Sequence, residues 1–114
     1  MKRFIIERHI PGASGFTKAE LAEFTRKCNI AIASLGVPYR WVNSYVAGDK
    51  VYCVHEAEDE DVIREQSRRC GMPASAVSVV VDEFGPYFAE PVRAAHADGH
   101  DDPPLPEMPC YQPL

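Results

Sequence analysis

Residues Arg40 to Asp61 read RWVNSYVAGDKVYCVHEAEDED, and this stretch has the pattern of a β-hairpin. Residues 39–47 and 50–56 are rich in Val, Tyr and Trp, which favour β-strands. Gly48-Asp49 lies between them and is a two-residue loop of the kind that closes a hairpin in a primed turn. The stretch therefore predicts two neighbouring antiparallel strands.

The turn also predicts which side chains of this hairpin share a face. A pairing of Ala47 with Lys50 opposes Tyr45 to Tyr52, Asn43 to Val54 and Trp41 to Glu56. The other face then carries Val42, Ser44, Val46, Val51, Cys53 and His55. Small branched side chains suit close packing under helices, so we expect this second face to form the core. The face with the aromatic rings and Glu56 is expected to lie open.

The segments around the hairpin add two helices and two strands. Residues 3–9 alternate weakly, are rich in Ile and Phe, and predict a first strand. Thr17 and Glu20 have the spacing of a capping box, and apolar residues at helical spacing continue to Leu35. The acidic run 58–61 suits the start of a second helix, which ends before Gly71. Residues 76–81 predict a last strand.

This order predicts an α+β fold of the ferredoxin-like βαββαβ type, with a four-stranded antiparallel sheet and two helices on one face. The uncovered face of such a sheet is either in water or covered by a second subunit, so a homodimer in the form of a dimeric α/β barrel is expected. We predict that residues 1–83 form this domain. Residues 84–114 contain seven of the ten prolines and predict an extended, proline-rich tail.

Composition and charge narrow the classes of function. The 114 residues are 46% hydrophobic and 25% charged, which is typical of one globular domain. The net charge of −5 disfavours binding to phosphate backbones, so no nucleic-acid partner is expected. No apolar run is long enough for a signal peptide or a membrane span, and we expect a cytoplasmic protein without a membrane partner.

Cysteine and histidine residues give few metal-site motifs. The four cysteines form no C-x-x-C pair, and Cys28, Cys53 and Cys70 fall at apolar positions, which predicts buried thiols. His55 is expected to be buried and hydrogen-bonded on the helix side. In the tail, His96 and His100 lie among aspartates, but without a folded scaffold we expect a solvated segment.

The residues RWVNSYVAGDKVYCVHEAEDEDVIREQSRRCGMP, with the earlier RFIIERHIPG, resemble a family of small bacterial proteins of unknown function that includes a nickel-binding, dimeric, ferredoxin-like protein. The resemblance covers about residues 2–81 and leaves the tail unmatched. It implies this fold, a homodimer and nickel as a cofactor. One position departs from the family pattern, because Asn43 replaces the histidine of its Trp-Val-His-Ser-Tyr strand.

The open face supplies the candidate site. Nitrogen and oxygen donors there suit Ni(II) or another divalent transition metal. The candidate metal ligands are Glu7, His9, Asn43, Tyr52 and Glu56, of which Glu7, His9 and Glu56 are the first candidates. Trp41 and Tyr45 are the candidates for contact with a bound cofactor or small-molecule ligand.

Other interpretations of the same residues stay open. The glutamates could form ion pairs with Arg8, Arg40 or Lys50, while the aromatic rings make a dimer contact. No nucleophile elbow, P-loop or dinucleotide fingerprint is present, so an enzyme is neither predicted nor excluded. The alternatives to a metal-binding protein are a small-molecule enzyme or ligand binder of the dimeric barrel type, and an oligomerisation module.

Overall fold

The structure of the chain, a computed structural model, describes residues 1–90. The chain divides into two units, Met1–Glu83 and Phe84–Leu114. The first unit holds strands β1 (Lys2–His9), β2 (Tyr39–Ala47), β3 (Lys50–Ala57) and β4 (Ala76–Val79), helices α1 (Lys18–Ser34) and α2 (Glu60–Cys70), and the short turn η1 (Ala13–Gly15).

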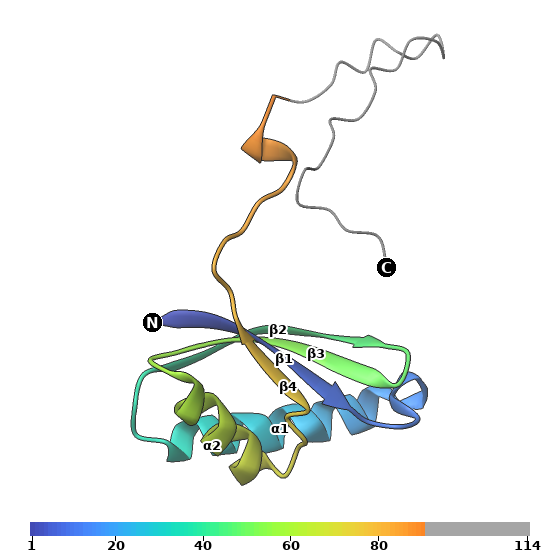
Figure 1. Ribbon diagram of the computed structural model, residues 1–114. Coiled ribbons are helices and arrows are strands. Elements are labelled where there is room, and N and C mark those ends of the chain that lie inside the picture. The colour runs from blue at the N-terminus through green and yellow to red at the C-terminus, as the bar shows by residue number, and fades with distance from the viewer. Residues whose placement is uncertain (91–114) are drawn as a thin grey trace, which may run out of the picture. The chain divides into compact units, whose positions relative to one another are not determined.

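The four strands form one antiparallel sheet in the order β2-β3-β1-β4. Both helices lie on the same side of this sheet, and the other side is left open within the first unit (Figure 1). This order and layering confirm the predicted ferredoxin-like α+β fold. Neither helix is long and apolar enough to cross a membrane, among the residues that the structure describes.

The sequence signals at the helix starts are confirmed. In α1 the Thr17 hydroxyl accepts a hydrogen bond from the Glu20 amide, while the Glu20 carboxylate accepts one from the Thr17 amide. Such reciprocal bonds satisfy amides that have no partner inside the helix. At α2 the Asp59 carboxylate accepts from the Val62 amide, so the acidic run both caps the helix and favours its dipole.

The hairpin follows the predicted register only near its turn. Ala47 pairs with Lys50, Tyr45 with Tyr52 and Asn43 with Val54, as predicted. The predicted pairing of Trp41 with Glu56 is wrong, because a β-bulge between Trp41 and Asn43 inserts one extra residue and pairs Trp41 with His55. An extra residue reverses the faces of every side chain beyond it. Trp41 therefore turns to the helix side.

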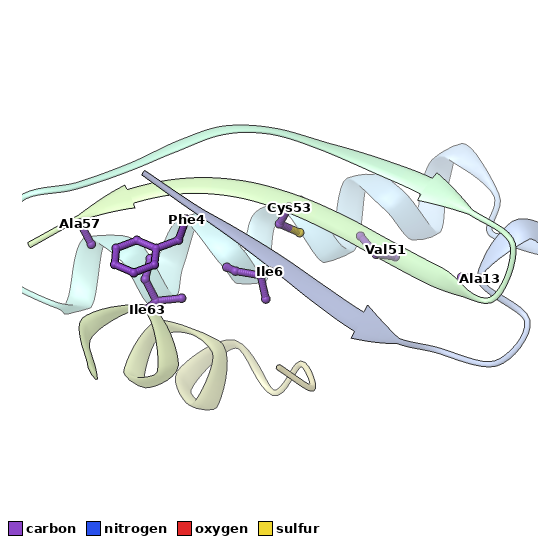
Figure 2. Packing of buried hydrophobic residues seen from close by; sticks show 7 residues of the cluster. All are labelled: Phe4, Ile6, Ala13, Val51, Cys53, Ala57 and Ile63. Carbon is purple, nitrogen blue, oxygen red and sulfur yellow. The ribbon is translucent and has the colours of Figure 1, made fainter. Parts of the chain in front are cut away.

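The main hydrophobic core lies between the sheet and the helices (Figure 2). Its buried members are Phe4, Ile6, Ala13, Val51, Cys53, Ala57 and Ile63. Ile6 from β1 and Ile63 from α2 are fully buried, and each buried aliphatic side chain of this size contributes about 1.5–3 kcal/mol to folding. The alternation of β1 and β3 thus places one set of side chains under the helices and leaves the other set on the open face.

The second unit is described as far as Glu90. Pro86–Phe88 form the short turn η2, and the rings of Phe84 and Phe88 lie edge to face with their centroids 6.3 Å apart. The remaining part of the predicted proline-rich tail, including His96 and His100, lies outside the described residues.

Candidate functional site

The open face of the sheet arranges its side chains in rows across three strands. The row nearest the hairpin turn joins His9, Lys50 and Ala47. The next two rows, moving away from the turn, are Glu7-Tyr52-Tyr45 and Ile5-Val54-Asn43. The last row is Arg3-Glu56-Arg40. The face therefore has an aromatic and apolar centre with charged groups at both ends.

Glu7 and His9 lie together at the end of this face nearest the turn. They are two residues apart on β1, so their side chains point to the same side at a spacing of about 7 Å. Lys50 is the strand partner of His9, and its ammonium group lies 3.3 Å from the Glu7 carboxylate. Glu7 therefore forms an ion pair with Lys50, which is one of the alternatives to a metal site that the sequence left open. A metal cation that binds to Glu7 must displace Lys50.

Glu56 lies at the opposite end of the open face. Its carboxylate accepts from Arg3 at 3.1 Å and from Arg40 at 3.4 Å. Glu7 is four residues beyond Arg3, the strand partner of Glu56, which separates the two glutamates by about 13 Å along the strands. The predicted convergence of Glu7 and Glu56 is therefore wrong. Glu56 is instead the anion between two arginines.

Asn43, Tyr45 and Tyr52 occupy the centre of the open face. The Asn43 amide donates a hydrogen bond of 3.0 Å to the Tyr45 hydroxyl, and both residues are exposed. Tyr52 is half-buried between Glu7 and Tyr45. Of the predicted ligands, Tyr52 is thus the direct neighbour of Glu7, whereas Asn43 is one row further from it.

Trp41 and Tyr45 lie on opposite faces, so they do not line one pocket. The Trp41 indole donates a hydrogen bond of 2.9 Å to the Ser44 hydroxyl and lies 5.9 Å from the His55 ring, measured between centroids. The expectation that His55 is buried and hydrogen-bonded is confirmed, because it is 1% exposed and contacts the Tyr39 hydroxyl through Nδ1. Burial lowers the pKa of His55 to about 3, with the charge of Arg8 as a smaller cause.

A pocket opens on the helix side, between α1 and the hairpin. Its volume is about 230 Å³, and Trp41 and Ser44 lie in its wall beside apolar side chains from both elements. The apolar lining includes Phe16, Leu21, Phe24, Val46 and Val51. A pocket of this size and lining suits a small, largely apolar molecule.

A fully buried arginine lies beneath these groups. Arg8 is 0% exposed, and its guanidinium donates to the Ser67 hydroxyl at 2.9 Å, to the Pro73 carbonyl at 3.0 Å and to the Cys53 sulfur at 3.4 Å. Its Nη2 atom has no hydrogen-bond partner in the described part of the chain, residues 1–90. A buried charge in this state is costly. Sequence reasoning treated Arg8 as a surface partner for glutamates, although strand alternation from Phe4 and Ile6 already indicates the core side.

Two of the buried thiols belong to one cluster between α1 and α2. Cys28 of α1 and Cys70 of α2 are 2% and 7% exposed, and the expectation of buried thiols is confirmed for these two and for Cys53. A hydrogen bond from the Cys28 thiol, with the charge of Arg8 and nearby backbone amides, lowers the pKa of Cys70 to about 6. The same hydrogen bond, together with burial, raises the pKa of Cys28.

The described residues do not form a complete site for a hard or borderline metal ion. Within residues 1–90 no three His, Cys, Asp or Glu side chains gather closely enough to hold a metal. Glu7 and His9 are neighbouring nitrogen and oxygen donors, and Tyr52 lies beside them, which gives part of a donor set. Four to six ligands are usual for Ni(II) and related ions, so further donors have to come from outside residues 1–90, for example from water or from another chain.

Comparison with known proteins gives two matches. The family model described as "Nickel responsive protein SCO4226-like" matches residues 4–80. The crystal structure of SCO4226 from Streptomyces coelicolor A3(2) is similar to this chain with a TM-score of 0.60 and 15% sequence identity, covering 72% of this chain and 99% of that one. No curated protein matches the chain. The structural likeness supports the fold, and the matched segment ends before the proline-rich tail.

Proposed function

The chain belongs to the SCO4226-like family of nickel responsive proteins, and from this premise we propose that it binds Ni(II) or a related divalent cation at the Glu7 and His9 end of the open sheet face. The observation that carries the proposal is the placement of a carboxylate and an imidazole on one exposed strand face, two residues apart. Imidazole and carboxylate donors suit divalent transition metals. Tyr52, next to Glu7, completes the candidate donors of one chain.

We further propose that two copies of the chain pack their open faces together and share the ion. The incompleteness of the donor set in residues 1–90 supports this, because a second Glu7 and His9 would raise the number of protein donors to four. The centre of the face also suits an interface, since Ile5 is 41% exposed and Tyr45 is 59% exposed. Aromatic side chains are enriched at such interfaces.

Calorimetric titration of the tag-free chain with Ni(II) tests the proposal. Glu7→Gln and His9→Gln are each expected to weaken binding by about tenfold or more, because each removes one ligand. Glu56→Gln is the matched control, since it removes a carboxylate from the other end of the same face and should leave the affinity unchanged. Equal affinities in all three variants, or no heat of binding to the unmodified chain, would reject the site.

Lys50 provides a second test of the same geometry. Its ammonium group neutralises Glu7 at 3.3 Å and competes with a bound cation. Lys50→Met is therefore expected to raise the affinity for Ni(II), while Lys50→Met combined with Glu7→Gln should lose this gain. Sedimentation of the same variants with and without metal measures whether two copies associate. A chain that binds the ion and stays monomeric would reject the sharing of the ion between two copies, but not the binding of the ion by one chain.

The helix-side pocket favours a second candidate function, the binding of a small molecule. The pocket of about 230 Å³ has an apolar wall with the Ser44 hydroxyl in it. Trp41 lines it and is the only tryptophan of the chain, so its fluorescence reports on occupancy. A phenol or indole titration should shift this emission in the unmodified chain and not in Val46→Phe, which fills the pocket. An identical response in both chains would remove this candidate.

A further inference from the structure

Three sulfur-containing side chains meet on the helix side of the sheet, away from the open face. Cys28 from α1 and Cys70 from α2 are buried in one cluster, and Met72 packs against it. The Gln66 amide of α2 donates to the Cys28 carbonyl of α1 at 3.4 Å, so the turn of α2 that precedes Cys70 packs directly on the turn of α1 that holds Cys28. Thiolate and thioether groups are the donors that soft metal ions prefer.

The end of α2 explains why Met72 joins the two cysteines. Gly71 adopts a left-handed conformation with φ of 74°, which a glycine adopts without strain. The Gly71 amide donates to the Arg68 carbonyl and the Met72 amide donates to the Ser67 carbonyl, the bond pattern of a Schellman motif. This motif folds the chain back over the last helical turn, which directs Met72 onto the cluster that contains Cys70.

Arg8 supplies the opposite charge for an anionic centre at this place. It is fully buried, its guanidinium donates to the Ser67 hydroxyl one helical turn before Cys70, and its Nη2 atom has no partner among residues 1–90. Two thiolates and one monovalent cation carry a net charge of −1, which one guanidinium balances. A Cys28–Cys70 disulfide is neutral and would leave the charge of Arg8 without a counterion.

We propose that Cys28, Cys70 and Met72 form a binding site for one soft monovalent ion of the copper(I) type, with Arg8 as its buried counter-charge. Binding replaces the thiol protons, which leave to solvent, and changes no oxidation state. Zinc structural sites use four ligands, whereas the cluster brings together three sulfur side chains, a number that favours copper(I) over zinc. Met72 is only partly buried and provides the side from which the ion enters.

The test is an anaerobic titration of the reduced full chain with Cu(I) in competition with a coloured Cu(I) chelator. The expected result is one tightly held ion for each chain. Cys28→Ser and Cys70→Ser should each abolish this binding, and Met72→Leu should weaken it by about tenfold. The matched controls are Cys110→Ser and Met108→Leu, which remove a thiol and a thioether from the tail and should leave the affinity unchanged.

X-ray absorption spectroscopy at the copper edge identifies the atoms bound to the ion. It needs only the unmodified chain, so it tests the proposal even if a cysteine variant fails to fold. Sulfur neighbours alone are expected around the ion, and nitrogen or oxygen neighbours would overturn the site. Retention of Cu(I) by a folded Cys70→Ser chain, or its loss in Cys110→Ser, would also overturn it. Formation of a Cys28–Cys70 disulfide without bound copper, seen by mass spectrometry, would show that the pair is a redox pair and not a metal site.

Discussion

The two faces of the sheet differ in the partners that their charged side chains have. On the open face each charged group has a partner of opposite sign, as in the Glu7–Lys50 pair and in Glu56 between Arg3 and Arg40. On the helix face Arg8 is buried with hydroxyl, carbonyl and thiol partners. Surface ion pairs contribute little to stability, whereas the loss of a partner in the interior costs much more. A change at a buried charged group on the helix face therefore alters the stability of the fold. The charged groups of the open face can exchange partners with little effect on stability.

The largest expected effect comes from Arg8→Ala. The substitution leaves the Ser67 hydroxyl and the Pro73 carbonyl without their donor and creates a cavity, so the free energy of unfolding should fall by about 3–5 kcal/mol. Urea unfolding followed by circular dichroism measures this. Arg40→Ala on the open face is the matched control and should have a much smaller effect. Comparable losses in the two variants would contradict the contrast between the faces.

A second effect of about 2 kcal/mol is expected from His55 when the pH falls from 7 to 5. The ordinary pKa of 6.5 applies in the unfolded chain and burial lowers it to about 3 in the fold, so between these values the unfolded chain binds a proton that the folded chain does not. Stability is therefore fully present above pH 6.5 and falls by up to about 1.4 kcal/mol for each pH unit below it.

Urea unfolding at several pH values checks this slope. His55→Asn should flatten it, because the titrating group is gone. His9→Gln removes an exposed histidine from the open face and should keep the slope of the unmodified chain. If the slope disappears in His9→Gln and persists in His55→Asn, the pH dependence of stability comes from the open face and the prediction for His55 is wrong.

Deletion of Val42 tests the bulge that sends Trp41 to the helix side. Because Val42 is the extra residue, its removal should keep Trp41 opposite His55 and lower the free energy of unfolding by only about 1 kcal/mol. The fluorescence of Trp41 measures its environment. An emission maximum typical of exposed tryptophan in the unmodified chain, which the deletion shifts to that of a buried ring, would show that the strand has no bulge and that Trp41 lies on the open face until Val42 is removed.

The smallest expected effect belongs to Glu56→Gln. Its ion pairs lie at the surface, so their loss should change the free energy of unfolding by less than about 1 kcal/mol, and the change should shrink further at high salt. Urea unfolding at low and high ionic strength measures both. If Glu56→Gln lowers the free energy of unfolding by more than Arg8→Ala does, the open face contributes more to stability than the buried charge, and the contrast between the faces is wrong.

The sequence predicted the elements well where local rules set them. The capping box at Thr17 and the Gly48-Asp49 turn fixed the start of α1 and the hairpin, and the element order led to the ferredoxin-like sheet. The assignment to a family that includes a nickel-responsive protein also followed from ordered motifs. Predicted binding roles for Glu7, His9 and the other candidate ligands stay predictions, as do the homodimer and the role of the tail.

The candidate site was harder to predict, because one residue altered it. Strand alternation correctly placed Glu7 and His9 on the open face, since β1 is regular. It misplaced Trp41, because local propensity gives no signal for a bulge at Val42. The prediction that Glu7 and Glu56 lie close together was also wrong. Strand alternation shows that both side chains point to the same face, but it does not show how far apart they lie along the strands.

Periodicity, caps and turns could be predicted from the sequence, because they depend on residues within a few positions of each other. Contacts between distant groups emerge only in the folded chain, as between Arg8 and both Ser67 and Pro73, and between Cys28 and Cys70. The physical reason is that packing in three dimensions, and not local backbone preference, sets contacts between segments far apart in the chain. Strand alternation already puts Arg8 on the core side, and the packing decides which groups its guanidinium meets there.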